Sequence, residues 1–310
     1  MTKLSVIVPV YNAERFLSRC LDSLFSQGLG EDEMEIVCVD DGSTDDSLSV
    51  LQGYASSHPS VKVYSQSHSG LGMTRNIALK YVSGEIVTFC DADDYLIPNG
   101  LRYVLDHFWD DQVDVVCHGS TTLDERKLKH WTENNDVTGD TVFDGSGQDA
   151  YERSPKYFVW NTLIRRSYIE EHHLNFRSMI MTEDSYFMLE LMMSNPRTRD
   201  VSSNIYRYTI NKEQLTRQRD VDTMRMCIES YAQFIARLKH YGLAKVVRQQ
   251  CVPFYSRILS AKLDKGDYLS VRKALQDLGL KSCPYALYAP MSWLFRQVFV
   301  PYILPHLSRG

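Results

Sequence analysis

A short apolar run, Ile86 to Cys90, is followed directly by the residues Asp91-Ala92-Asp93-Asp94. Unpaired carboxylates are costly in an apolar interior, so this acidic group is expected at the end of a strand rather than within it. The carboxyl ends of strands are where α/β sheets bind ligands. An Asp-X-Asp pair there offers oxygen ligands to a hard divalent cation, which usually also holds phosphate oxygens. These residues therefore predict a site for a metal ion and a diphosphate.

The elements that would position this site are short apolar runs that stop at polar residues. There are four in the first hundred positions: Leu4 to Val10, Glu35 to Val39, Val61 to Tyr64 and Ile86 to Cys90. Apolar residues follow the first run at helical spacing, namely Phe16, Leu17, Cys20, Leu21 and Leu24. Asn12, between that run and the helix, is a candidate N-cap. Alternation of strands and helices predicts βαβ units and a parallel sheet.

Five short motifs follow one another along the chain. They are Pro9-Val10-Tyr11-Asn12, Val39-Asp40-Asp41-Gly42-Ser43, Arg75-Asn76, Asp91-Ala92-Asp93-Asp94 and Glu183-Asp184. In this order and spacing they resemble the family 2 glycosyltransferases, over roughly residues 3–217. Trp160-Asn161 and Arg165-Arg166 are similar to the stretch that precedes the Glu-Asp motif in capsule and exopolysaccharide members. The resemblance implies an α/β GT-A fold, Rossmann-like, with a mainly parallel central sheet and a C-terminal helical region.

The same resemblance implies an inverting, metal-dependent transfer of a sugar from a nucleotide diphosphate donor to a hydroxyl of a glycan or lipid-linked acceptor. Family habit favours a UDP-sugar. The donor-binding positions that it implies are Pro9, Tyr11, Asn12, Asp41, Arg75, Asp91, Ala92 and Asp93. Asp93 is the expected ligand of the cation, with Asp91 on the ribose or the metal. Mn²⁺ and Mg²⁺ both suit a site of carboxylate, phosphate and water.

Several donor-site residues also have simpler interpretations. Asp41 can cap a helix together with Ser43 instead of contacting the base, and Pro9 can simply end its strand. Arg75 can be an exposed helix residue instead of a cation facing the nucleotide or the acidic cluster. The pair Gly70-X-Gly72 partly matches a dinucleotide fingerprint, but Arg75 occupies the third glycine position. The arginine at the third glycine position disfavours a dinucleotide site, and so does the location of the pair outside the first βα turn.

Asp184 is the candidate general base, because inversion needs a carboxylate beside the acceptor hydroxyl to take its proton. Glu183 would orient or tune it. The alternative for Asp184 is a carboxylate that only stabilises a helix N-terminus. Trp160 is equally compatible with a platform for the acceptor sugar and with core packing. His172-His173 lacks partners at metal-ligand spacing and is interpreted as a surface turn.

Two functions from different classes remain open. One is a glycosyltransferase of the hexosyl or N-acetylhexosaminyl type in surface polysaccharide synthesis, and the other is a catalytically inert relative that scaffolds a polysaccharide assembly. The intact Asp93 and Asp184 favour the enzyme. The Gln-X-X-Arg-Trp signature of processive members is absent from the sequence, which favours one sugar per acceptor visit.

The chain has 310 residues, and we expect a catalytic domain over 1–217 and a helical region over 218–310. The catalytic domain divides into a nucleotide-binding half, 1–98, and an acceptor half, 99–217. In the second half a helix is expected from Gly100 and a strand over Val113–Cys117, and the polar residues 118–150 are interpreted as a variable excursion containing a hairpin. Seven scattered cysteines without a Cys-X-X-Cys pair indicate buried thiols in a reducing compartment.

Charge is unevenly distributed. Residues 221–310 carry 13 basic and 5 acidic residues, a balance of +8, whereas the preceding 220 carry 21 basic and 34 acidic residues, a balance of −13. The end of the chain, 284–307, is rich in aromatic residues and prolines, which favours an anionic membrane surface over nucleic acid as partner. The alternative is a helix packed on the catalytic domain or in a homodimer. With no signal peptide or run of 18 apolar residues, a cytoplasmic protein is expected, peripheral on the inner face of the membrane if this tail binds there.

Overall fold

The computed structural model describes residues 3–124, 137–154, 158–179, 181–211 and 221–247. The chain divides into two units. Unit 1 comprises Met1–Met179 and Glu183–Asn211, and unit 2 comprises Ile180–Thr182 and Lys212–Gly310. The expected domain boundary near residue 217 falls among residues 212–220, outside the described residues.

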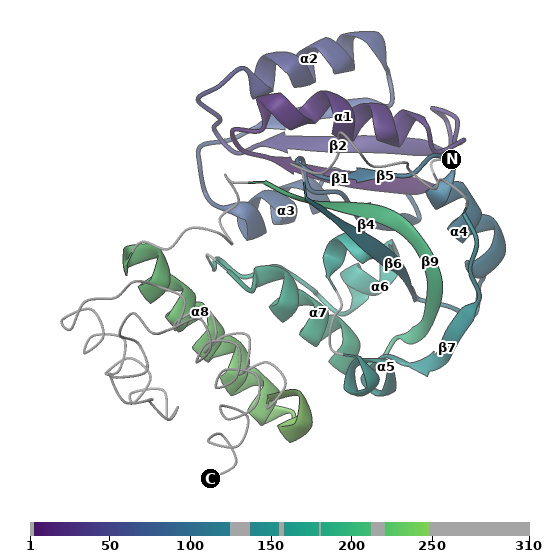
Figure 1. Ribbon diagram of the computed structural model, residues 1–310, viewed down its shortest axis with the longest axis vertical. Coiled ribbons are helices and arrows are strands. Elements are labelled where there is room, and N and C mark those ends of the chain that lie inside the picture. Colours follow the sequence, from purple (N-terminus) through teal and green to yellow (C-terminus); the bar gives the residue numbers. More distant parts are fainter. Residues whose placement is uncertain (1–2, 125–136, 155–157, 180, 212–220, 248–310) are drawn as a thin grey trace. The chain divides into compact units, whose positions relative to one another are not determined.

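The first half of unit 1 is the expected succession of strands and helices (Figure 1). Its elements are β1 (Leu4–Val10), α1 (Glu14–Phe25), β2 (Met34–Asp40), α2 (Ser47–Ser57), β3 (Val61–Ser65), α3 (Leu71–Leu79) and β4 (Ile86–Phe89). The four strands are parallel and lie side by side in the order β3-β2-β1-β4. All four expected runs therefore form strands, and the carboxyl ends of these strands meet at one edge of the sheet.

Both faces of the central strands are buried, as the continuous apolar runs require. All residues of β1 and β2 are buried. Alternate residues of these strands join one core cluster with the buried side of α1, among them Val6, Val8, Ile36 and Cys38. The five apolar residues expected on that side of α1 are all buried. Helix α3 packs against β1 and β2, on the face opposite α1 and α2 (Figure 1).

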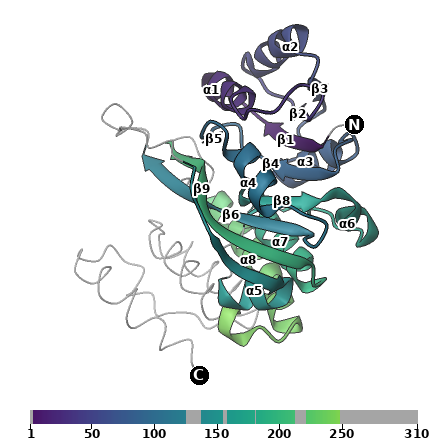
Figure 2. The ribbon, with the colours of Figure 1, turned by 90° about the vertical axis from the view of Figure 1, so that its right-hand side faces the viewer.

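The second half of unit 1 extends the same sheet. Its elements are β5 (Tyr95–Leu96), α4 (Gly100–Phe108), β6 (Val115–Asp124), β7 (Thr141–Ser146), α5 (Gly147–Arg153), a 3₁₀ turn (Val159–Asn161), β8 (Thr162–Arg165), α6 (Arg166–Glu171), α7 (Glu183–Met193) and β9 (Arg197–Ile210). The full order is β3-β2-β1-β4-β8-β6-β9-β5, with β7 also paired to β9. Figure 2 shows the long β9 running beside β6.

The central strands β3, β2, β1 and β4 are parallel, as expected, and the second half of unit 1 adds antiparallel strands to the sheet. Among the described residues, four strand pairs are parallel and four are antiparallel, and the antiparallel ones all involve β8 or β9. Strand β6 extends to Asp124 and β7 begins at Thr141, and these two strands pair with opposite edges of β9 instead of with each other. The described part of residues 118–150 therefore does not form the expected hairpin, and residues 125–136 lie outside the described residues.

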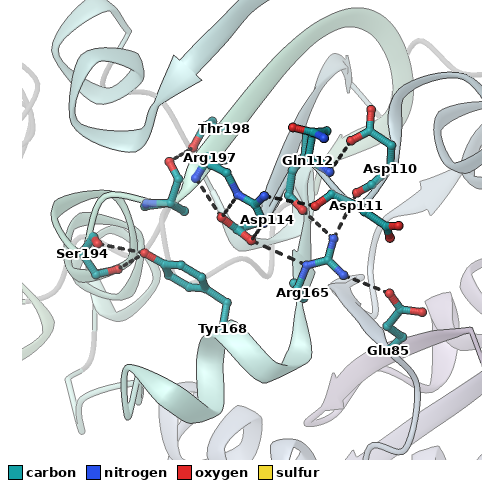
Figure 3. A network of polar contacts seen from close by, with 12 residues as sticks. Glu85, Asp110, Asp111, Gln112, Asp114, Arg165, Tyr168, Ser194, Arg197 and Thr198 are labelled. Atoms are coloured by element: carbon teal, nitrogen blue, oxygen red, sulfur yellow. Dashed lines mark hydrogen bonds and ion pairs between the residues drawn. The ribbon is translucent and has the colours of Figure 1, made fainter.

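A polar network joins the strand ends of the second half (Figure 3). The carboxylate of Asp114 accepts hydrogen bonds from Arg197 Nη2 at 2.6 Å and Nε at 2.9 Å. Burial alone would raise the pKa of Asp114, but the hydrogen bonds and charge of Arg197 lower it. Arg165 donates to Glu85 and to the carbonyl of Val113, so β8 is tied to the chain before β4 and before β6.

Unit 2 contains helix α8 (Val221–His240) within the region predicted to be helical. No helix among the described residues is long and apolar enough to cross a membrane. The aromatic tail, 284–307, lies outside the described residues, so the membrane and dimer hypotheses stay predictions. Five of the seven cysteines are described, and all five are buried free thiols, as expected.

Candidate active site

The residues Asp91-Ala92-Asp93-Asp94 follow β4 at the carboxyl edge of the parallel strands. Ala92 is buried in the core cluster, whereas Asp91 and Asp93 are partly exposed. Oδ1 of Asp91 lies 2.8 Å from Nη2 of Arg75. Oδ2 of Asp93 accepts a hydrogen bond of 2.8 Å from the side-chain amide of Asn211. The two outer aspartates therefore keep solvent access while their positions are fixed by protein donors.

Asp94 differs from its two acidic neighbours because it is fully buried. Its Oδ2 accepts a hydrogen bond of 2.8 Å from the hydroxyl of Tyr206, and its Oδ1 accepts one of 2.7 Å from the backbone N–H of Thr209. Burial, and then the charges of Asp93 and Asp91, raise the pKa of Asp94 well above its usual range. Asp94 thus ties this loop to β9.

Arg75 stands between the two groups of carboxylates. Its side chain is 2% exposed, Nη2 contacts Asp91, and Nη1 lies 2.9 Å from Oε1 of Glu183 at the start of α7. The guanidinium also lies 5.4 Å from the ring centre of Phe176. Arg75 is therefore a buried bridging cation, and its interpretation as an exposed helix residue is wrong.

Glu183 and Asp184 have unusual proton affinities. Burial, followed by the negative charge of Asp184, raises the pKa of Glu183 to about 7 despite the pairing with Arg75. Burial raises the pKa of Asp184 more than Arg75 and the hydrogen bonds from Ser185 lower it. Carboxylates with raised pKa values beside a buried cation such as Arg75 are suited to proton transfer.

The residues expected to bind the nucleotide lie at the ends of β1 and β2. Tyr11 is 47% exposed, and its ring stacks on that of His68 at a centroid distance of 4.2 Å. Asn12 adopts φ 48° and accepts a hydrogen bond of 2.8 Å from the backbone of Thr44, so it joins two loops. It is not the N-cap of α1, since that position is Ala13.

Pro9 does not end β1, which continues to Val10. A proline is tolerated in this central strand because the pairing with β4 stops at Ile7, so its missing N–H has no partner strand on that side. Pro9 itself is opposite Val39 of β2 in the strand register.

Asp41 is buried, and its carboxylate is held by groups from four residues. Oδ1 accepts from Gln66 Nε2 at 2.7 Å and from the backbone N–H of Ser69 at 2.9 Å, and Oδ2 accepts from Gly70 N–H at 2.9 Å and lies 2.9 Å from His68 Nδ1. Gly70 is the N-cap residue of α3, so Asp41 fixes the start of the helix that carries Arg75. It does not cap α2, whose N-cap is Asp46. Its contact with a nucleobase stays a prediction.

The residues present fit a hard divalent cation. Asp91 and Asp93 are partly exposed and offer carboxylate oxygens as ligands. The described residues contain no group of three or more His, Cys, Asp or Glu side chains that could hold a metal by themselves, so the remaining ligands would come from the substrate and water. One or two carboxylates together with substrate phosphates and water is the way Mg²⁺ is usually bound, and Mn²⁺ accepts similar oxygen ligands.

Trp160 is a core residue, which decides between its two interpretations. It is 7% exposed and stacks on Tyr206 at 4.6 Å and on Phe158 at 4.8 Å. His172 and His173 form the expected exposed turn after α6. Sequence reasoning missed Tyr206 on β9 and Asn211 just after it, because both lie more than a hundred residues from the acidic motif and no local pattern links them to it.

The model of the family described as glycosyl transferase family 2 matches residues 5–188, which is more than half of the chain. The chain belongs to this family. Among curated relatives, the uncharacterized glycosyltransferase EpsJ of Bacillus subtilis (strain 168) is 30% identical over 250 residues, covering 79% of this chain and 72% of EpsJ. The putative glycosyltransferase EpsH of the same strain is 30% identical over 210 residues, which are 67% of this chain but 60% of EpsH.

A further curated relative is the poly(ribitol-phosphate) beta-N-acetylglucosaminyltransferase TarS of Staphylococcus aureus (strain MW2). It is 28% identical over 215 residues, which are 69% of this chain but 36% of TarS. The crystal structure of S. aureus TarS 1-349 in complex with UDP-GlcNAc has a TM-score of 0.68 at 22% identity, covering 99% of this chain and 87% of that one. This family 2 chain therefore has the GT-A fold of such structures.

Proposed function

We propose that this family 2 glycosyltransferase transfers a single sugar, with inversion, from a nucleotide diphosphate donor to a hydroxyl of a glycan or lipid-linked acceptor in surface polysaccharide synthesis. The observation that carries the proposal is the bridging position of Arg75, 2.8 Å from Asp91 and 2.9 Å from Glu183. One buried cation thereby connects the carboxylates suited to a metal and diphosphate with the pair suited to proton transfer.

A UDP-sugar is the favoured donor. In support, TarS, a relative of this chain, has been crystallised with UDP-GlcNAc. The use of a divalent cation has a parallel in a mannosyltransferase from Pyrobaculum calidifontis, which was crystallised with GDP-Man and Mn²⁺ and whose structure has a TM-score of 0.59 to this chain at 19% identity. The exposed ring of Tyr11 offers a flat apolar surface to a base or ribose.

The proposed reaction is a displacement at the anomeric carbon of the donor sugar. The acceptor oxygen forms a bond to that carbon while the bond to the diphosphate breaks, and the electron pair leaves with the diphosphate. Asp184 takes the proton of the acceptor hydroxyl, and Glu183 orients it. Asp93 and Asp91 would hold Mn²⁺ or Mg²⁺, which offsets the charge that develops on the leaving diphosphate. Arg75 holds the Asp91 carboxylate in place.

The test is calorimetric titration of UDP in the presence and absence of Mn²⁺, together with a thermal-shift screen of nucleotide sugars. Asp93→Asn is expected to keep the fold yet abolish the Mn²⁺-dependent part of UDP binding, because one of two carboxylate ligands becomes a neutral amide. Asp106→Asn, on an exposed position of α4, is the matched control. Unchanged metal-dependent UDP affinity in Asp93→Asn would reject Asp93 as the ligand, and failure of every nucleotide sugar to bind wild type would reject the function.

A further inference from the structure

The hydroxyl of Tyr206 joins two groups of the acidic motif. It accepts a hydrogen bond of 3.1 Å from the backbone N–H of Asp91 and donates one of 2.8 Å to Oδ2 of Asp94. The phenolic O–H therefore donates to the carboxylate of Asp94, and a lone pair of the phenolic oxygen accepts from the backbone N–H of Asp91. The peptide N–H at the start of the metal motif is thus held by a side chain from β9.

The ring that carries this hydroxyl is itself immobilised. Tyr206 is fully buried, and its ring stacks on Trp160. Its backbone is opposite Leu96 in the antiparallel pairing of β5 with β9. One residue pair along, Tyr95 is opposite Arg207 in the same ladder. Because both the ring and the backbone are fixed, the hydroxyl presents a rigid reference point to the loop between β4 and β5.

The position of the Asp91 backbone decides where its carboxylate stands. That carboxylate contacts Arg75, which in turn contacts Glu183. A hydrogen bond reaches only about 3 Å, so a small displacement of Asp91 would separate its oxygen from the guanidinium. The contact made by Tyr206 therefore acts on the donor site without touching the donor.

We infer that Tyr206 is a positioning residue for the donor site: its hydroxyl fixes the backbone at Asp91 and so sets the geometry in which Asp91 meets Arg75 and the donor's cation. The part that concerns the donor and the cation rests on the proposed function. The part that concerns the anchoring of Asp91 does not. Buried groups left without a hydrogen-bond partner are costly, so loss of this hydroxyl should loosen the loop.

The test compares Tyr206→Phe with Tyr168→Phe. The hydroxyl of Tyr168 donates a hydrogen bond of 2.8 Å to the carbonyl of Ser194, so its removal deletes a comparable contact elsewhere in unit 1 (Figure 3). Each variant keeps its aromatic ring. Hydrogen exchange of the peptide covering 90–96 reports the anchoring of Asp91. Steady-state kinetics over a range of Mn²⁺ and donor concentrations report its consequence.

In Tyr206→Phe we expect faster exchange over 90–96, together with about a tenfold rise in the half-saturating Mn²⁺ concentration or in the donor KM, the scale of one buried hydrogen bond. The kcat at saturating Mn²⁺ should stay within about twofold, because excess cation restores the bound geometry. Tyr168→Phe should change none of these. If Tyr206→Phe fails to fold, Trp160→Phe, which reduces the stacking that holds the Tyr206 ring, should give the same pattern in weaker form.

Unchanged exchange over 90–96 overturns the inference whatever the kinetics show. Faster exchange with unaltered Mn²⁺ and donor dependence also overturns it, because the hydroxyl would then serve the fold alone. If wild type neither binds nor turns over any nucleotide sugar, the proposed function fails, and the exchange measurement then decides the anchoring of Asp91 by itself.

Discussion

Arg75 and Glu183 are 108 residues apart in sequence, yet Nη1 of Arg75 lies 2.9 Å from Oε1 of Glu183 in the buried centre of unit 1. Among the described ion pairs, Arg75 is the partner of Glu183, and Arg75 itself also pairs with Asp91. Removing one member of a buried ion pair leaves an uncompensated charge, which costs far more than the loss of a surface pair.

Arg75→Met should lower the free energy of unfolding by about 3–5 kcal/mol at pH 8, since Glu183 loses its partner. The loss should be smaller at pH 5, because an unpaired Glu183 can then bind a proton. Denaturant unfolding at the two pH values measures both effects. Arg102→Met, which breaks a partly exposed pair with Glu33, should cost about 0–1 kcal/mol. Equal losses in the two variants would show that the Arg75 bridge contributes no special stability.

Asp184→Asn should reduce turnover by about 10²-fold or more, the scale of general-base catalysis, with little loss of donor binding. The amide retains the size of the side chain but cannot accept the acceptor's proton. Parallel measurement of kcat and of UDP affinity separates the two effects. Glu183→Gln is the matched comparison, and near-normal turnover in Asp184→Asn with a severe loss in Glu183→Gln would move the base to Glu183.

The rate should depend on pH through the carboxylate pair. A base must be unprotonated to act, and the raised pKa values of Asp184 and Glu183, about 7 for the latter, mean that both bind protons more readily than ordinary carboxyl groups. We therefore expect kcat/KM to fall as the pH is lowered from 8 to 5. A pH–rate profile measures this. A rate that stays flat down to pH 5 would contradict the assignment of this pair.

Deletion of residues 284–310 should release the protein from anionic liposomes while leaving donor hydrolysis largely intact. Basic residues near an anionic surface contribute roughly 1 kcal/mol each, and salt screens that attraction. Sedimentation with liposomes at low and high salt tests the expectation, with neutral liposomes as the control. Equal sedimentation of the truncated protein, or no binding by the full chain, would assign the tail to the fold or to a dimer.

The first half of the fold was accessible from sequence because its information is local. Each apolar run ends at a polar residue, so strand ends and the helical face of α1, with Phe16 and Leu24 among its buried residues, follow from spacing alone. The acidic motif was located for the same reason, since charge cannot continue a buried strand. The buried state of Arg75 was open, because a single residue on a short helix gives no indication of the face it occupies.

The second half depends on contacts that no local pattern records. Strand β7 pairs with β9 across more than fifty residues of sequence, and the polar pattern of residues 118–150 gives no indication of this distant partner. The hydrogen-bond donors to Asp94 lie on β9, over a hundred residues away in sequence. The sequence alone therefore does not distinguish Asp94 from the other acidic residues of the motif. Asn12 was expected to cap a helix because asparagine favours that position, but its oxygen is used by Thr44 from a separate loop.

The pairing of β5 with β9 has a consequence for how such enzymes can be recombined. Residues 1–98 look like an exchangeable unit, since they contain all of the residues predicted to bind the donor. Yet Tyr95 and Leu96 end in a ladder with Arg207 and Tyr206, and Asp93 is held by Asn211. A chimera that imports residues 1–98 from a relative while retaining the native β9 would combine a loop and a strand that were not selected together. The set of residues that positions the acidic motif is therefore discontinuous in sequence, because it includes β9 and the residue just after it.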